Sequence, residues 1–173
     1  NPPDVFGLRS EDAIMAIVPM CHANAGALTF AVPAAGAKLV MPGPALDGAS
    51  IYELLESERV SSTAAVPTVW LGLLQYLEET GKKLPHLRRV VVGGAACPPM
   101  MIRKFELDYD VEVIHGWGMT EMSPVGTTGK FKHATAGLDR EAILKLKEKQ
   151  GRTPYLVEMK TVDDDGRELP RDG

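Results

Sequence analysis

Thr120 and Glu121 are the adjacent side chains of this sequence that best combine for chemistry on a phosphate-containing ligand. The segment before them, 113–118, joins the predicted end of a buried strand to two glycines that permit a sharp turn with the backbone close to a ligand. A hydroxyl beside a carboxylate at the carboxyl end of a strand suits a polyphosphate and Mg²⁺, respectively. The alternative is a turn with a surface glutamate, and the pair alone does not decide between the two.

Two further segments at predicted strand ends carry candidate residues. Gly93, Gly94 and Ala95 offer backbone against which a flat ring can lie, although two glycines after a strand are equally typical of a tight turn. His22 follows another apolar run and is either a ligand contact or a satisfied core histidine. Because a parallel sheet aligns the carboxyl ends of its strands, we expect His22, segment 93–95 and segment 116–121 to line one crevice.

The elements that must position these residues alternate between short apolar runs and helix-like segments. The predicted strands are 13–18, 38–41, 62–66, 89–92 and 111–114. Such alternation predicts repeated βαβ units, and therefore an α/β fold with a mostly parallel sheet flanked by helices.

Several helix ends can be predicted from their residue types. Ser50 is a candidate cap for the helix that follows it, and Pro67 stands where proline is accepted at a helix start. Gly81 is expected to end that second helix, and Asp139 to cap a later, charged one.

The pattern of residue types along the chain changes after Pro124. Residues 125–137 are predicted to form a loop. Residues 155–162 are predicted to form an edge strand that leads into an Asp-Asp-Asp-Gly turn. We therefore expect an α/β subdomain over 1–124, a loop and helix connection over 125–152, and the start of a small β subdomain over 153–173.

Composition excludes several classes of partner and site. The chain has 173 residues, 45% of them hydrophobic, and a net charge of −4 without a Lys/Arg-rich block, which argues against a nucleic-acid surface. Cys21 and Cys97 lie far apart and predict neither a disulfide framework nor a zinc site. No leader or apolar run of the roughly 20 residues needed for a membrane span is present, so we expect a cytoplasmic location.

The string Gly-Trp-Gly-Met-Thr-Glu at 116–121 closely resembles the signature of the adenylate-forming superfamily, in which Tyr usually stands where this sequence has Trp117. The resemblance implies that Thr120 contacts the phosphates of ATP, that Glu121 binds Mg²⁺, and that Gly93, Gly94 and Ala95 lie along the adenine and the acyl pocket. Residues Gly116, Trp117, Gly118 and Met119 would complete the nucleotide site. Trp117 is either a stacking partner for adenine, a contact worth about 1 to 3 kcal/mol, or a core aromatic.

Two other strings narrow the resemblance. Segment 19–26, Pro-Met-Cys-His-Ala-Asn-Ala-Gly, is similar to the Pro-Met-Phe-His segment of fatty acyl-CoA synthetases, which implies that His22 orients the substrate carboxylate or a phosphate oxygen. Segment 66–70, Val-Pro-Thr-Val-Trp, is common in the same enzymes and offers an apolar lining. Segment 20–26 has no carboxylate to hold the ammonium of an amino acid, so the resemblance favours a fatty acid. His115, beside the signature, has either a place in the acyl pocket or a packing role.

The resemblance implies an acid–thiol ligase that uses ATP, Mg²⁺ and CoA on a fatty acid. An aryl-acid ligase and a non-catalytic nucleotide-binding or scaffold fragment remain alternatives. The phosphate loop, the ribose-binding Thr-Gly-Asp and the C-terminal catalytic Lys of that superfamily are not found in this sequence. We therefore expect the chain alone to be inactive, and to self-associate through exposed sheet edges and its apolar cleft.

Overall fold

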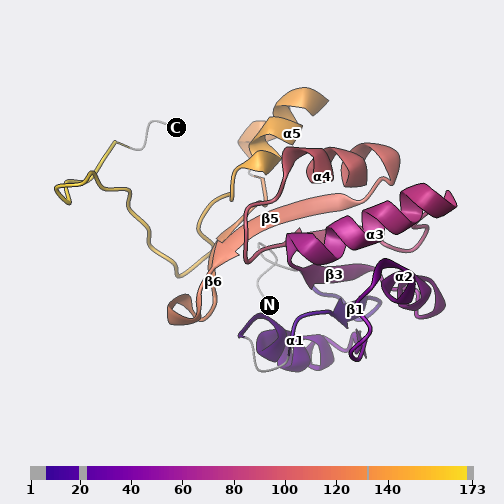
Figure 1. Cartoon of the computed structure of the whole chain (residues 1–173). Coiled ribbons are helices and arrows are strands. Elements are labelled where there is room, and N and C mark those ends of the chain that lie inside the picture. Colours follow the sequence, from indigo (N-terminus) through magenta and orange to yellow (C-terminus); the bar gives the residue numbers. More distant parts are fainter. Residues whose placement is uncertain (1–6, 20–22, 132, 171–173) are drawn as a thin grey trace.

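The computed structural model describes residues 7–19, 23–131 and 133–170, which form one sheet with helices on both faces (Figure 1). The sheet has six strands in the order β2-β1-β3-β4-β5-β6. The first five strands are parallel, and β6 is antiparallel to β5. The strands are β1 (Ala13–Ala16), β2 (Lys38–Val40), β3 (Ser62–Ala65), β4 (Arg89–Val92), β5 (Glu112–Gly118) and β6 (Val125–Thr128). The predicted α/β fold with a mostly parallel sheet is confirmed.

The helices are α1 (Ala23–Ala34), α2 (Gly48–Ser57), α3 (Pro67–Thr80), α4 (Pro99–Arg103) and α5 (Arg140–Glu148). A π-helical turn, η1 (Lys104–Asp108), continues α4, and two short 3₁₀ turns occur at η2 (Thr120–Met122) and η3 (His133–Thr135). In the part of the chain that the structure describes, none of the helices is long and apolar enough to cross a membrane.

The main core lies between the sheet and helices α2 to α5. Paired residues of neighbouring parallel strands point to the same face, so Met15, Thr63, Val90 and Val113 form one row across the sheet. Three members of this row, all but Thr63, belong to the main apolar cluster, together with the fully buried Trp70 of α3.

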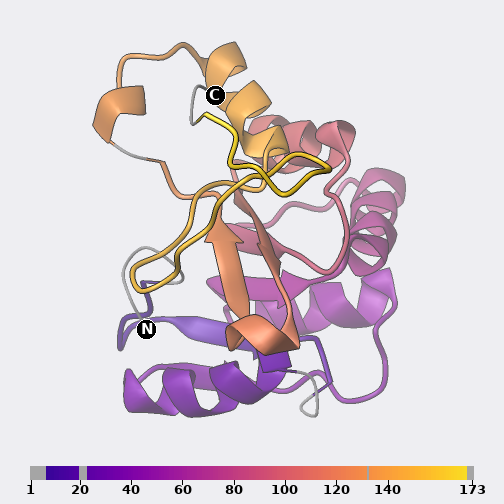
Figure 2. The ribbon, with the colours of Figure 1, turned by 90° about the vertical axis from the view of Figure 1, so that its left-hand side faces the viewer.

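The opposite face is covered less completely. Ala16, Ala64, Val91 and Ile114 form the corresponding row there. Helix α1 covers the β1 end of this face, where Leu28 and Val32 of the helix pack with Ile14 and Ala16. In Figure 2, α1 lies low in the view, helices α2 to α4 lie at the right, and the β6 arrow stands near the centre. The β4 and β5 members of the row are left to line a cavity.

Three of the four predicted helix ends agree with the structure. Pro67 is the first residue of α3, and Gly81 ends that helix in the left-handed conformation at φ 67°. Asp139 caps α5 by accepting a hydrogen bond from the Ala142 N–H at 2.8 Å. The prediction for Ser50 was wrong, because Asp47 is the N-cap of α2 and accepts hydrogen bonds from both the backbone N–H and the hydroxyl of Ser50.

The structure also corrects the sequence prediction around β5 and β6. Gly116 and Gly118 lie within β5 rather than in a sharp turn, because this strand approaches the backbone of β6 closely. A Cβ at Gly118 would lie 2.1 Å from the Pro124 carbonyl oxygen, and one at Gly116 would lie 3.0 Å from that of Thr127. Residues 125–128, expected in a loop, form β6.

Residues 155–162 do not form the predicted edge strand. In this segment an antiparallel bridge joins Val162 to Glu168 around the turn at 163–166. Figure 1 shows the chain after α5 projecting away from the helices as an extended segment. A strand needs a partner for its N–H and C=O groups, and the described residues offer this segment little pairing.

Candidate functional site

A cavity of about 540 Å³ opens at the carboxyl ends of the parallel strands, on the face that carries α1. Val18 and Pro19 after β1, Val66 after β3, and Gly93 and Gly94 after β4 contribute to its wall. The β5–β6 ribbon contributes residues from 116–121 and 124–128. The structure therefore brings together loops that are far apart in the sequence, at the sheet edge where α/β proteins bind ligands.

The connection between β5 and β6 presents Thr120 and Glu121 at the rim of this cavity. The Met119 N–H donates to the Pro124 carbonyl at 2.9 Å and closes the loop at its base. Within the loop, the Met122 N–H donates to the Met119 carbonyl at 3.0 Å, which forms the turn η2. Both candidate side chains are exposed and line the cavity, so a hydroxyl and a carboxylate are available to a ligand there.

Trp117 lines the same cavity. The residue is 38% exposed, so Trp117 is not the buried core aromatic that was the alternative interpretation. The Trp117 N–H donates to Oγ1 of Thr127 in β6 at 3.2 Å, which fixes the backbone from which the indole projects. An aromatic face held in this way can stack on a flat ring.

The glycines after β4 are also placed at the cavity, although Ala95 is not. Gly93 and Gly94 line it, whereas Ala95 is exposed and is not among the lining residues. Gly94 has a φ of 80°, a left-handed conformation that favours glycine. A bare backbone therefore faces the cavity at two of the three predicted positions.

His115 and Cys97 lie behind this loop rather than in the cavity. The Cys97 N–H donates to Nε2 of His115, which is buried. Burial lowers the pKa of His115, and the nearby backbone of Lys147 and Glu148 acts in the opposite direction. Burial raises the pKa of the Cys97 thiol to about 11, so this thiol stays protonated and is no nucleophile at neutral pH. His115 was expected either to line the acyl pocket or to have a packing role, and the structure favours the packing role.

The apolar wall of the cavity is formed mainly by residues outside segment 66–70, which was predicted to provide it. Of that segment, Val66 alone lines the cavity, and Trp70 is buried in the main core with its Nε1–H donating to the Ala65 carbonyl at 3.2 Å. Ala64, Val91 and Ile114 form the apolar wall instead. The alignment of these three residues in adjacent strands follows from strand register, which the sequence does not show.

His22 lies outside the described residues, and its predicted role stays a prediction. Val18 and Pro19, which precede it, do line the cavity. The carboxyl end of β1 is therefore at the expected place.

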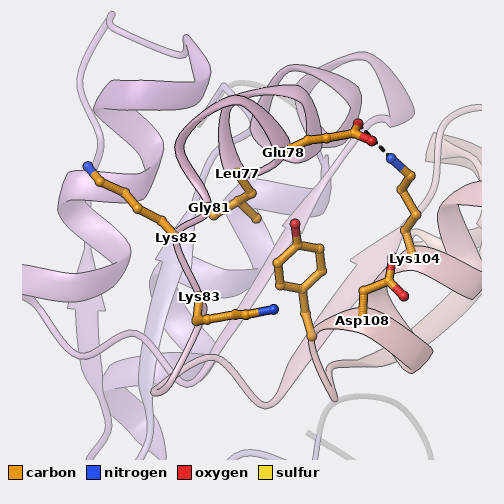
Figure 3. Close-up of a pocket in the computed structure, with 8 residues that line it drawn as sticks. Leu77, Glu78, Gly81, Lys82, Lys83, Lys104 and Asp108 are labelled. Atoms are coloured by element: carbon orange, nitrogen blue, oxygen red, sulfur yellow. Dashed lines mark hydrogen bonds and ion pairs between the residues drawn. The ribbon is translucent and has the colours of Figure 1, made fainter.

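A second hollow, of about 380 Å³, lies at the end of α3 and beside η1 (Figure 3). Helix α3 starts at the carboxyl end of β3, so its last turn lies toward the opposite edge of the sheet. The lysines there already have partners: Lys104 pairs with Glu78 at 2.7 Å, and Lys82 donates to the Tyr76 hydroxyl at 2.6 Å. Lys83 lies 5.4 Å from the ring centre of Tyr109. This hollow is therefore a weaker candidate than the strand-end cavity.

Comparison of the whole sequence with known protein families identifies the family to which this chain belongs. Residues 2–173 match the family model described as AMP-binding enzyme. The chain belongs to the AMP-binding enzyme family. The resemblance of segment 116–121 to the adenylate-forming superfamily is thereby confirmed.

Individual relatives of this AMP-binding chain are acyl-CoA ligases. A medium-chain-fatty-acid–CoA ligase of Ectopseudomonas oleovorans is 50% identical over 171 residues, which cover 99% of this chain and 31% of the relative. A 3-methylmercaptopropionyl-CoA ligase of Ruegeria pomeroyi is 46% identical over 173 residues, which cover 100% of this chain and 32% of the relative. The chain thus spans about a third of the length of these relatives.

The fold of the AMP-binding chain is also found in a solved relative. The structure of a Mycobacterium tuberculosis fatty acyl CoA synthetase superposes with a TM-score of 0.77 at 25% sequence identity, over 95% of this chain and 30% of that one. The arrangement of strands and helices described above is therefore shared with a fatty acyl-CoA synthetase.

Proposed function

We propose that this chain forms one wall of the adenylate site in a longer, ATP-dependent fatty acid–CoA ligase. The observation that carries the proposal is the meeting of Gly93, Gly94, Trp117 and the Thr120–Glu121 pair around one cavity. These residues offer bare backbone, an aromatic face, a hydroxyl and a carboxylate, which together suit a nucleoside triphosphate and its metal ion.

The proposed reaction has two steps. The carboxylate of the fatty acid attacks the α-phosphorus of ATP, giving an acyl-adenylate and pyrophosphate. The thiol of CoA then attacks the acyl carbon, loses its proton and releases AMP as the thioester forms. In this proposal Thr120 holds phosphate oxygens, and the backbone of Gly93 and Gly94 lies along the adenine and the acyl pocket. His22 orients the substrate carboxylate or a phosphate oxygen.

Glu121 is the proposed ligand of Mg²⁺. The residues present fit this ion, because Mg²⁺ takes one or two protein carboxylates and completes its shell with water and phosphate. The exposed carboxylate of Glu121 lies at the cavity rim, where it is accessible to an ion. When bound, the ion would neutralise charge on the phosphates.

The apolar wall of Ala64, Val91 and Ile114 supports a fatty acid as substrate. Among the described lining residues, the acidic side chain is Glu121, so no second carboxylate is offered there to an ammonium group. The two ligases compared above act on a medium-chain fatty acid and on 3-methylmercaptopropionate, and either class fits an apolar wall. An aryl-acid ligase is the rival within the family.

Substrate profiling of the full-length protein tests this proposal. Formation of CoA esters would be measured with acetate, 3-methylmercaptopropionate, benzoate, octanoate and palmitate, with ATP and Mg²⁺ present. We expect octanoate or palmitate to be the preferred acid. Activity confined to benzoate would overturn the fatty-acid assignment, and no ester formation with any acid would overturn the ligase.

The separate chain has its own proposed properties. We expect the 173-residue chain to be inactive alone, because the phosphate loop, the ribose-binding segment and the catalytic Lys of the superfamily are not found in it. We also expect it to self-associate, since Phe30, Tyr155 and Leu156 expose 80%, 79% and 86% of their surface. Light scattering that shows a monomer at high concentration would contradict self-association. The β subdomain from residue 153 onward and the cytoplasmic location likewise stay predictions.

A further inference from the structure

Gly126 of β6 lies directly against the indole of Trp117. A Cβ placed on Gly126 would lie 2.5 Å from Cε3 and 2.5 Å from Cζ3 of Trp117, and 2.9 Å from Sδ of Met122. Carbon atoms that are not bonded pack at about 3.5 to 4.0 Å. Position 126 therefore has no room for a side chain while the indole keeps this place.

The local strand pairing explains why the indole comes so close. Trp117 pairs with Thr127 and Gly118 pairs with Val125, so Gly126 is the additional residue of a bulge between these two pairs. Bulges of this kind redirect a side chain next to a functional site. Here the bulge places a bare backbone under the six-membered ring of the indole.

The backbone of Trp117 is held from the same strand. Its N–H donates to Oγ1 of Thr127, the residue that follows Gly126. A methyl group at position 126 would force one of two changes. Either the indole swings into the cavity, or β6 moves away and breaks the hydrogen bond to Thr127. Both changes alter the wall of the cavity that Trp117 lines.

We propose that Gly126 is a positioning residue for nucleotide binding, because its missing side chain seats the Trp117 indole against β6 and sets the width left for a flat ring. The proposal rests on the function proposed above, in which that ring is the adenine of ATP. It assigns to Gly126 a steric role that is specific for tryptophan at position 117. A smaller ring at that position would leave room for a methyl group.

A double-mutant cycle in the full-length protein tests the pairing. The variants are Gly126→Ala, Trp117→Tyr and the combination of both, and the readouts are KM for ATP, KM for CoA and kcat. We expect Gly126→Ala to raise KM for ATP about tenfold, the size of a lost stacking contact, and to leave KM for CoA unchanged. The double variant should resemble Trp117→Tyr alone, since the phenol ring avoids the clash.

Gly72→Ala serves as the matched control. Gly72 lies within α3, and an ideal Cβ there meets no atom within 4 Å. This variant should keep the kinetic constants of the unmodified protein. An unchanged KM for ATP in Gly126→Ala, or additive effects in the double variant, would overturn the proposal.

A spectroscopic measurement separates the packing from the reaction. With 5-fluorotryptophan incorporated, the ¹⁹F resonance that disappears in Trp117→Tyr is assigned to Trp117. Gly126→Ala should shift this resonance in the absence of nucleotide, and an unshifted resonance would refute the contact. A shifted resonance with unchanged KM for ATP would overturn the role in nucleotide binding, while CoA-ester formation tests the ligase separately. If Gly126→Ala does not fold, a double variant that is soluble and active supports the proposal. If neither Gly126→Ala nor the double variant folds, the proposal is overturned.

Discussion

Nε2 of His115 accepts a hydrogen bond from the backbone N–H of Cys97 at 3.2 Å. His115 immediately precedes the signature at 116–121, and Cys97 lies in the loop that begins at Gly93. The bond therefore joins two segments of the proposed nucleotide site from behind. It requires an unprotonated Nε2, which agrees with the lowering of the His115 pKa by burial.

Replacing His115 with Leu should destabilise the protein by about 1 to 3 kcal/mol, because the buried N–H of Cys97 loses its acceptor. The free energy of unfolding of the full-length protein, from denaturant titration, measures this cost. His115→Gln can still accept the bond and should lose less. Equal losses in the two variants would contradict a role for the hydrogen bond.

Asp12 should make stability dependent on acid. Burial acts to raise its pKa, but hydrogen bonds from the Arg9 N–H and the Ser61 hydroxyl, together with the Arg88 charge, lower it below 3.8 overall. A lowered carboxyl pKa stabilises the fold above the unfolded value of 3.8, and this contribution is lost as pH falls through the folded pKa. We expect Asp12→Asn to be less stable at pH 7 and to lose less stability between pH 5 and 2. Parallel pH profiles for the two proteins would refute this role.

Two glycines at the contact between α2 and α3 should respond in opposite directions to alanine. A Cβ at Gly48 would lie 2.3 Å from the Gly72 carbonyl oxygen, so Gly48→Ala should destabilise the protein. Gly72 is inside α3 with open space around it, so Gly72→Ala should stabilise it by about 0.5 to 1 kcal/mol through helix propensity. Thermal unfolding of both variants checks the prediction, which fails if the two shifts have the same sign.

Lys147 should be a strong stability determinant although it is charged. Its Nζ lies 2.6 Å from the Glu106 carboxylate and donates to the Val113 carbonyl at 3.0 Å, with 6% of the side chain exposed. Lys147→Met would leave the Glu106 charge without its cationic partner, at a cost of about 3 kcal/mol. Lys145→Met, on the exposed side of the same helix, is the control and should change stability little. Similar losses in the two variants would show that the ion pair is not the cause.

The parallel part of the fold was predictable because each buried strand is a short apolar run with a clear end. The run at 89–92 coincides with β4, and Pro67 and Gly81 mark α3 as expected. Residues 125–128 read Val-Gly-Thr-Thr, which lacks the hydrophobic signal of a strand, and their pairing with β5 depends on glycines that permit close approach. Local sequence does not contain that information.

The site was predictable to a similar extent. Strand ends located Gly93, Gly94, Trp117, Thr120 and Glu121, because parallel strands end at one edge. The inward direction of Trp70 depends on helix rotation, and the wall formed by Val91 and Ile114 depends on register. Gly126 could have been noticed only as a glycine inside an unrecognised strand, where it marks a bulge.

Glu121→Gln in the full-length protein tests the adenylate site most directly, with exchange of labelled pyrophosphate into ATP as the measured half-reaction. Loss of a preorganised charge at a phosphoryl transition state should slow exchange about a hundredfold or more. Glu53→Gln, an exposed carboxylate on α2, is the control and should leave exchange unchanged. Fatty-acid-dependent exchange that persists at the control rate in Glu121→Gln would contradict the proposed site.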